Sequence, residues 1–532
     1  MRRREFLVAS AATLALPAVA RGDKSSVLKF IPFPVDQAVL DPVWTASGVN
    51  HSIMVFDTLY GQTGPERGYA ATPQMLAGHT VEADGKIWKL TLRDGLMFHD
   101  GTKVLARDCV ASVKRWGVRD VLGQTLMQRT DELSAPDDRT IVFRLKKPFV
   151  LLPIALGQFT GAPGTLCAIM PERLASTDPY EQVTEMIGSG PFRFKKDEWV
   201  PGSLRVYERF KDYKPREDGS PDGTSGPKVV HFDRVEWHVI PDPATAAAAL
   251  RAGEMDWWAY PSPDFLPQLR QDSKVGIQGY TGGFCPYLRP NHMVPPFDNR
   301  AVRQALMGAV DQAEFMTAAF GPDRSLWQVP VGFFAPSSPF VSEVGMAALN
   351  GPRDYAKVRK DVEAAGYRGE TVVFLASTQP FFKEWSSVAA EMMRRAGMNV
   401  DYQVMDLAAS LQRRASKKPP SEGGWSAYVG ALTGVVSSSP ATNSALRGNG
   451  EEAPLWGWPS SPKIEALREE WLDASDLATQ KKLAAEIQEQ AFIDAPYYPL
   501  GINFTPTAFR SDLTGVLTAS GGPLFWNVRR QA

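Results

Sequence analysis

The sequence predicts mixed α/β domains, and three observations lead to that prediction. The chain has 532 residues, more than a single hydrophobic core accommodates, so we expect two or three domains. Segments whose apolar residues alternate, which is typical of half-buried strands, are interleaved with segments of helical periodicity. The composition, with 44% hydrophobic and 22% charged residues, is that of a globular protein and gives no sign of disorder.

The first expected strand lies in "KSSVLKFIPF", and a half-buried strand follows in "KIWKLTLRDGLMF". In the second segment Trp88 and the two leucines after it share one face, and Asp94-Gly95 is the turn that closes the strand. The segment "LARDCVASVKRW" carries a helical stripe of apolar residues that includes Cys109. We therefore expect this cysteine in a core.

Later segments continue the alternation of strands and helices. "GPFRFKKDEWVPGSLRVYER" predicts a hairpin that turns at Pro201-Gly202, and "FDRVEWHVIPD" predicts a half-exposed strand. "ATAAAALRAGEMDWW" predicts a helix that ends at Gly253, and "FDNRAVRQALMGAVDQ" predicts a helix with Asp298 as its N-cap. Two more helices are expected in "KEWSSVAAEMMRRAG" and "ATQKKLAAEIQEQAF".

The first twenty residues, "MRRREFLVASAATLALPAVA", predict an export signal that is cleaved after Ala20. Arginines precede an apolar stretch, and small residues precede the expected cleavage site. The order Arg3-Arg4-Glu5-Phe6-Leu7 resembles the twin-arginine signal, which makes the twin-arginine export machinery an expected partner. The apolar stretch is shorter than the roughly 20 residues that span a bilayer. We expect the mature protein to be soluble and periplasmic.

Charge and motif content argue against several classes of protein. The net charge of the chain is −1. Residues 1–20 have three arginines and one glutamate, a charge of +2, so the rest of the chain carries −3. This balance gives no reason to expect a nucleic-acid partner. The sequence has no G-x-S-x-G, H-E-x-x-H or phosphate-loop motif, so no catalytic residue is assigned and no enzyme is expected.

The histidines and cysteines give no pattern of a metal site. Six histidines are scattered with no pair at i, i+4, and His99 beside Asp100 has no partner of that kind. Cys109, Cys167 and Cys285 form no C-x-x-C pair, so no metal and no cofactor is expected. In an oxidising compartment one disulfide and buried free thiols are both compatible with this spacing.

Five segments together point to a family. "WKLTLRDGLMFHDGTKVLARDCVASVKRW" joins L-R-D-G, F-x-D-G-T and a helix start A-x-D-V, with Cys109 in place of the valine. "IGSGPFRF" follows a G-T-G-P-Y pattern with Ser189 and Phe192 in place of its threonine and tyrosine. "VIPDPATAAAALRAGEMDW", "NHMVPPFDNRAVRQALMGAVDQAEF" and "APYYPLG" follow in order. From about Val27 to the C-terminus, the chain resembles the peptide- and nickel-type substrate-binding proteins of ABC importers, solute-binding family 5.

This resemblance implies a two-lobed periplasmic binding protein of type II, in the large peptide-binder class, with an extra subdomain in lobe I. A hinge joins the lobes, and the ligand is enclosed between them. After the signal at 1–20, we expect the lobe I core at 23–46, 187–275 and 496–532, the accessory subdomain at 47–186, and lobe II at 276–495. The expected partners are a small solute and a membrane permease with a separate ATPase, and the protein is expected to be a monomer.

The expected ligand is a peptide or a peptide-like solute. In the peptide binders of this family, a segment of lobe II with a tryptophan followed by acidic residues supplies an aspartate that pairs with the ligand's amine. The equivalent stretch here begins at Trp425 and has no Asp or Glu from Gly423 to Gly450. An enclosed ammonium needs a counter-charge, so either another carboxylate supplies it or the ligand has no free amine there. A blocked peptide, a modified amino acid of the opine type or a sugar-like solute would fit the second case.

Seven residues are candidate ligand contacts, because aromatic walls with a few polar groups suit a solute pocket and loops after strands commonly line ligand crevices. These are Trp44, Thr378, Gln379, Phe382, Trp385, Trp425 and Tyr428. Phe382 and Trp385 are equally compatible with a place in the core of the second lobe.

Two other functions stay open from the sequence. A ligand receptor or peptide chaperone that is not coupled to import would use the same two lobes. A secreted hydrolase would need a nucleophile–base pair or a metal set, and scattered triads leave no spacing signal.

Overall fold

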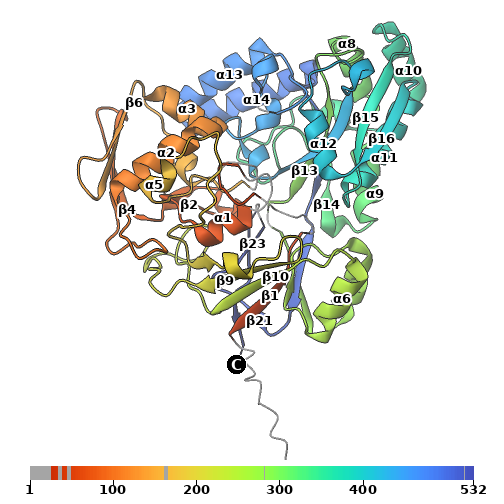
Figure 1. The fold of residues 1–532 in the computed structure, drawn as a ribbon. Helices are drawn as coiled ribbons and strands as arrows, with labels where there is room; N and C mark the ends of the chain where they lie inside the picture. The colour runs from red at the N-terminus through yellow and green to blue at the C-terminus, as the bar shows by residue number, and fades with distance from the viewer. Residues whose placement is uncertain are drawn as a thin grey trace, which may run out of the picture.

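The computed structural model describes residues 26–33, 39–44, 49–160, 166–280, 282–453, 455–519 and 522–531. Within these ranges the chain forms two seven-stranded sheets, one four-stranded sheet and three two-stranded ribbons (Figure 1). The expected export signal, residues 1–20, lies outside the described residues.

The first sheet gathers strands from both ends of the chain. Its order is β12 (Val275–Gly279), β20 (Pro506–Arg510), β11 (Trp257–Trp258), β1 (Val27–Ile31), β10 (Arg234–His238), β9 (Leu204–Arg209) and β8 (Phe192–Phe194). The strand β1 runs parallel to β10 and β11, which puts three carboxyl ends at one edge of the sheet.

The second sheet is built from the later part of the chain. Its order is β14 (Trp327–Gln328), β19 (Ile502–Asn503), β13 (Phe284–Pro290), β17 (Ala427–Thr433), β15 (Thr371–Ser377) and β16 (Asn399–Met405), and β18 (Tyr498–Pro499) also pairs with β13. The strands β17, β15 and β16 are parallel to one another. Strand pairing therefore puts the crossings between the sheets at 279–284 and 503–506, whereas the lobe boundaries expected from the sequence are 275/276 and 495/496.

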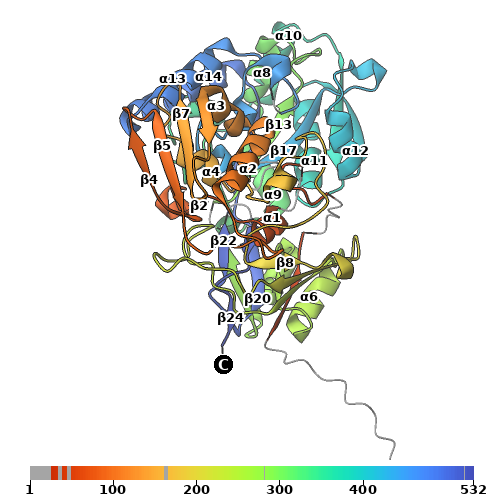
Figure 2. The same cartoon turned by 60° about the vertical axis from the view of Figure 1, so that its left-hand side comes forward.

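The accessory subdomain carries the third, antiparallel sheet, which Figure 2 shows beside the helices α3 and α4. Its strands are β4 (Leu76–Glu82), β5 (Ile87–Leu92), β7 (Thr140–Leu145) and β6 (Thr130–Ser134). The ribbons are β2 (Tyr60–Gln62) with β3 (Ala71–Pro73), β21 (Leu513–Thr514) with β24 (Arg529–Arg530), and β22 (Leu517–Ala519) with β23 (Gly522–Leu524).

Helices occur in all three parts of the molecule. They are α1 (Val49–Val55), α2 (Ala106–Arg119), α3 (Val121–Arg129), α4 (Leu152–Gly157), α5 (Glu172–Ala175), α6 (Pro243–Ala252), α7 (Leu266–Gln271), α8 (Arg300–Met307), α9 (Gln312–Phe320), α10 (Tyr355–Ala364), α11 (Phe382–Arg395), α12 (Leu407–Arg414), α13 (Pro462–Asp473) and α14 (Leu477–Asp494). Among the described residues, none of these helices is long and apolar enough to cross a bilayer.

Local patterns in the sequence predicted several elements correctly. In β5 buried and half-buried residues alternate, and Trp88 lies on the buried face. Cys109 is fully buried on α2, and Gly253 ends α6 in the left-handed conformation with φ 76°. All three cysteines are free, which decides between the two alternatives that their spacing left open.

One predicted helix cap is wrong by one residue. The side chain of Asn299, not that of Asp298, accepts a hydrogen bond from the backbone N–H of Ala301 at 2.9 Å and begins α8. Asp298 still belongs to the preceding turn, where its N–H donates to the carbonyl of Val294. Both residue types are good caps, so the sequence alone could not decide between adjacent positions.

Two buried ion pairs join the accessory subdomain to the first lobe. Arg115 on α2 donates to both carboxylate oxygens of Asp41, at 3.0 and 2.8 Å. Lys228 donates to Asp57 at 2.7 Å, and the Tyr213 hydroxyl donates to the second oxygen of that carboxylate. All four side chains of the two pairs are 2% exposed or less. Removal of either partner of such a pair leaves a buried charge without its counter-charge, so both partners are needed at this joint.

We predict that Arg115→Met destabilises the protein by about 3–5 kcal/mol, because it leaves the Asp41 carboxylate buried without its cation. Urea denaturation followed by circular dichroism measures the change. Arg173→Met is the matched control in the same subdomain, since Arg173 and Glu185 are both half-exposed, and we expect it to cost less than about 1 kcal/mol. Equal effects of the two substitutions would contradict the assignment.

His99, which follows the strand β5 and its turn, has a structural role. The Gly188 N–H donates to Nδ1 at 3.4 Å, so Nε2 carries the proton and donates to the Gly190 carbonyl at 3.0 Å. The imidazole thus ties the turn at Asp100-Gly101 to the segment that leads into β8. Burial lowers the pKa of His99 to about 4.

Because the pKa of His99 is about 4 when folded and about 6.5 when unfolded, the unfolded chain binds more protons between these pH values. The stability that depends on neutral His99 is complete above pH 6.5 and is lost as the pH falls towards 4. We predict that the stability difference between wild type and His99→Gln changes by roughly 1–3 kcal/mol from pH 7 to pH 4.5. Denaturation at a series of pH values tests this, and parallel curves would contradict it.

Candidate functional site

The carboxyl ends of the parallel strands in the two sheets face each other. In the first sheet β12 and β11 are both antiparallel to β20, and β1 is parallel to β11, so β12 runs in the same direction as β1. The strand β12 ends where the chain crosses to the second sheet. In the second sheet β13 begins just after this crossing and runs antiparallel to β17, so β17 and its parallel neighbours end there. We call the boundary between these two edges the interlobe seam. In α/β sheets ligands bind outside the carboxyl ends of strands.

Aromatic side chains from both sheets pack together at the crossing. Tyr260, just after β11, lies 5.7 Å from Phe33, just after β1, measured between ring centroids. Its ring also stacks on Tyr280 at 5.2 Å and meets Phe284, the first residue of β13, at 6.3 Å. The group connects the carboxyl edge of the first sheet to the first residue of the second, at the place where a hinge would bend.

The end of β17 contacts residues on the other side of the seam. The Thr433 hydroxyl donates to the carbonyl of Thr160, which belongs to the accessory subdomain. The Gly434 N–H donates to the Gly283 carbonyl at 2.8 Å, and a Cβ at position 434 would overlap the carbonyl oxygen of Gly282. Glycine is therefore needed where the strand passes the crossing.

After β17 the chain folds into a segment rich in hydroxyl groups, residues 433–443. The Thr442 hydroxyl donates to the Val436 carbonyl at 3.0 Å, and Ser338 donates to the carbonyl of Ser438 at 2.5 Å. The sequence has no Asp or Glu from 423 to 450, so this wall is neutral. Asp406, which follows β16 at the same edge, uses its carboxylate to cap α12 through the N–H of Ala409.

Comparisons with known proteins identify the family. The model of the bacterial extracellular solute-binding proteins, family 5 (middle), matches residues 70–453. A probable peptide ABC transporter periplasmic-binding protein, y4tO of Sinorhizobium fredii, is 35% identical over 98% of both chains. The chain belongs to family 5 of the bacterial extracellular solute-binding proteins.

A more distant relative and two solved structures are also similar to this chain. The glutathione-binding protein GsiB of Pectobacterium atrosepticum is 24% identical over 82% of this chain and 81% of its own. The solved structure of AgaA from A. tumefaciens R10, in complex with agropinic acid, has a TM-score of 0.76 at 20% identity and covers 95% of this chain and 99% of its own. DppA of Helicobacter pylori, in complex with the peptide STSA, has the same TM-score and identity, with 95% and 98% covered. The family 5 protein thus has the two-lobed fold of periplasmic peptide-binding proteins.

Two of the seven predicted contact residues of the family 5 protein lie at the interlobe seam. Thr378 and Gln379 follow β15, and the Thr378 N–H donates to the carbonyl of Met405 at the end of β16. Thr378 is exposed and Gln379 is half-buried, so both side chains are open to a ligand. As ligand contacts they remain predictions.

Phe382 and Trp385 lie on the helix-covered face of the second sheet. Trp385 is 2% exposed and packs 6.0 Å from Phe320 on α9 and 5.5 Å from Phe382, measured between ring centroids. Its surroundings are those of a core side chain, the alternative that the sequence left open. Phe382 is half-buried at the edge of the same cluster.

Trp425 and Tyr428 lie at the start of β17, at the end of the strand away from the seam. The Trp425 indole donates to the carbonyl of Arg414, and the guanidinium of Arg414 covers the ring of Tyr428 at 4.1 Å. Tyr428 precedes Thr433 by five residues of extended chain, about 16 Å. The prediction followed the tryptophan of this segment and did not include residues 433–443, where the strand reaches the seam. The missed signal was the polar stretch "TGVVSSSPATN" directly after an apolar strand.

Trp44 lies against the accessory subdomain. The guanidinium of Arg119 lies 4.4 Å above its ring, and the same guanidinium approaches Tyr180 at 5.2 Å. The indole N–H is buried and has no hydrogen-bond partner among the described residues. The structure therefore does not gather the seven predicted residues into one pocket.

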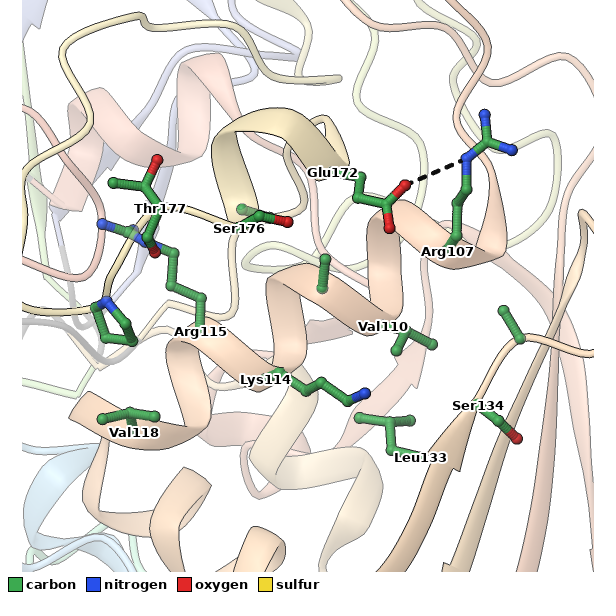
Figure 3. Close-up of a pocket in the computed structure, with 14 residues that line it drawn as sticks. Arg107, Val110, Lys114, Arg115, Val118, Leu133, Ser134, Glu172, Ser176 and Thr177 are labelled. Atoms are coloured by element: carbon green, nitrogen blue, oxygen red, sulfur yellow. Dashed lines mark hydrogen bonds and ion pairs between the residues drawn. The ribbon is translucent and has the colours of Figure 1, made fainter.

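A separate hollow of about 750 Å³ opens on the outer face of α2 (Figure 3). Val110 and Leu133 line it, Lys114 extends along it, and Arg107 pairs with Glu172 at 3.5 Å on one side. None of these residues follows a strand of the two large sheets, so the hollow is not part of the interlobe seam.

We predict that Thr378→Trp in the family 5 protein reduces the solute that co-purifies with it at least about tenfold, because the bulky ring fills the seam. As a substitution of an exposed residue it should change stability by less than about 0.5 kcal/mol. Trp385→Ala should behave in the opposite way and lose about 3–5 kcal/mol while it keeps the solute. Mass spectrometry of the released solute and thermal unfolding measure the two effects, and loss of solute in Trp385→Ala alone would contradict this placement.

Proposed function

We propose that this protein is the periplasmic solute-binding component of an ABC importer that takes up a peptide or a peptide-like solute. The solute is enclosed at the interlobe seam, and the closed form delivers it to a membrane permease with its ATPase. The observation that carries the proposal is that the carboxyl ends of strands from two sheets face each other across two chain crossings. The names of the relative y4tO and of the structural neighbours support a peptide-like ligand.

Several finer points belong to the same proposal. Residues 1–20 direct export through the twin-arginine machinery and are removed after Ala20, and the mature protein acts as a monomer. The lobes divide at the crossings 279–284 and 503–506, and residues 47–186 form the accessory subdomain of lobe I. The protein carries out no covalent step, because its role is to capture and to release.

The neutral wall after β17 supports a finer proposal about the ligand. Residues 433–443 themselves offer no carboxylate to an ammonium enclosed against them, and an unpaired buried charge costs several kcal/mol. We propose that the ligand presents a neutral group to this wall, as a blocked peptide, a modified amino acid or a sugar-like solute does.

The first experiment denatures protein purified from the periplasm and identifies the released small molecules by mass spectrometry. The second compares a library of di- and tripeptides with the same library N-acetylated, by isothermal titration calorimetry. We predict that acetylation weakens the affinity of a peptide by no more than about threefold and strengthens it for some peptides. A tenfold or greater loss of affinity on acetylation would show that a carboxylate holds the amine. Steady product formation from either library would overturn the proposal of a binding protein.

A further inference from the structure

A cluster of four charged residues joins the accessory subdomain to the second lobe. Arg129, the last residue of α3, donates to Asp473 at 2.6 Å and to Glu469 at 2.9 Å, and both acceptors are on α13. Lys147, just after β7, donates to the second oxygen of Asp473 at 2.7 Å. We call Arg129, Lys147, Glu469 and Asp473 the rim cluster. Figures 1 and 2 both place α13 beside α3, whereas the first sheet lies at the other end of the molecule.

The acidic residues of the rim cluster are unfavourable for the helix that carries them. Glu469 and Asp473 are four residues apart, so they lie on one face of α13 and repel each other. Asp473 also lies in the last turn, where the helix dipole disfavours negative charge, and α13 has no basic residue in that turn. The compensating cations come from the accessory subdomain. Taken alone, α13 would be more stable without these carboxylates, so their benefit arises where the two parts of the molecule meet.

The exposure of the rim cluster differs from that of the pairs that fix the accessory subdomain to the first lobe. In Asp41–Arg115 and Asp57–Lys228, every side chain is 2% exposed or less. In the rim cluster only Arg129 is buried, at 6%, while Asp473 and Glu469 are 44% and 57% exposed. Water can solvate these carboxylates as soon as they separate from their partners. The rim cluster can therefore separate and re-form at a lower electrostatic cost than the two buried pairs.

We infer that the rim cluster is a closure latch: it favours the closed arrangement of the lobes without touching the ligand and thereby sets how readily the protein closes. The inference goes beyond the proposed function, and it rests on the lobes parting to exchange solute. A contact that exists only in the closed arrangement shifts the balance between closed and open forms by its own free energy. Because the latch is electrostatic and partly exposed, salt weakens it.

The test measures the distance between the lobes in ligand-free protein by pulsed electron paramagnetic resonance. Spin labels are attached at Val81→Cys on β4 and Val404→Cys on β16, where both side chains are exposed. Cys285, which is partly exposed, is replaced by serine, while Cys109 and Cys167 are buried and burial raises the pKa of both thiols. The fold of each variant is checked by circular dichroism and thermal unfolding.

At low salt we expect a closed population that Glu469→Gln/Asp473→Asn reduces roughly three- to tenfold relative to the open one. In 1 M salt, where charges are screened beyond about 3 Å, the wild type should approach the variant. In an Arg129→Gln/Lys147→Gln background, the same two substitutions should change the ratio less than about twofold. The matched control is Glu314→Gln, which removes an exposed ion pair with Arg395 inside the second lobe and should leave the ratio unchanged.

A distance distribution that neither salt nor the paired substitutions shift would overturn the latch, and so would an equal shift in Glu314→Gln. The measurement uses no ligand, so it decides the question even if no solute of the proposed kind binds. Conversely, failure of the peptide libraries to bind would contradict a peptide ligand and leave the latch to be judged on these distances alone.

Discussion

The two buried ion pairs between the accessory subdomain and the first lobe constrain the rest of the molecule. Asp41–Arg115 and Asp57–Lys228 place four charges out of water, and each carboxylate also accepts hydrogen bonds from backbone or hydroxyl groups. A buried pair of this kind cannot be loosened by degrees, because any separation leaves a charge in a medium of low dielectric. These pairs tie the subdomain to the first lobe, so in the proposed closure the bending falls at the two crossings between the large sheets.

The contrast between buried and half-exposed charge separates permanent from reversible contacts. Where both partners are enclosed, desolvation makes separation costly. Where the carboxylates of Glu469 and Asp473 are half-exposed, water replaces the lost partner and separation costs little. The same residue types thus serve two purposes, and burial decides which. The contacts at the interlobe seam carry no formal charge. The Thr433 hydroxyl donates a hydrogen bond there, and the ring of Tyr260 packs against that of Phe284.

Much of the fold could be predicted from local sequence patterns, because the spacing of apolar residues shows which side of a strand or helix is buried. The alternation in β5 and the buried stripe of α2 follow directly from which residues can face a core. The resemblance to the solute-binding family supplied the two-lobed arrangement, which no periodicity contains. The cap of α8 at Asn299 was missed because Asp298 beside it is chemically equivalent for that role.

The candidate site was predicted less well, since it depends on strand register and not on residue type. Trp425 and Tyr428 were selected as aromatic residues of the segment equivalent to the family's tryptophan segment, but the register of β13 against β17 puts them at the far end of the strand from the seam. Thr378 was selected from its place after a strand, and it does lie at the seam. Position along a strand, and not aromatic character, decides which of the predicted residues lie at the seam. The charged residues of the rim cluster gave no sequence signal, because Arg129 and Asp473 are more than 300 positions apart.

A neutral seam and a charged rim respond to different variables. Hydrogen bonds and aromatic contacts at the seam depend on the shape and polar groups of the solute, and ionic strength affects them little. The charge pairs of the rim depend on salt and are indifferent to which solute is enclosed. Under the proposed function, substitutions at the seam change which solute is recognised and leave the charge pairs of the rim intact. In the proposed latch, substitutions on α13 adjust closure, since Glu469 and Asp473 form ion pairs with Arg129 and Lys147 of the accessory subdomain. The two proposals together therefore assign specificity and readiness to close to different parts of the chain.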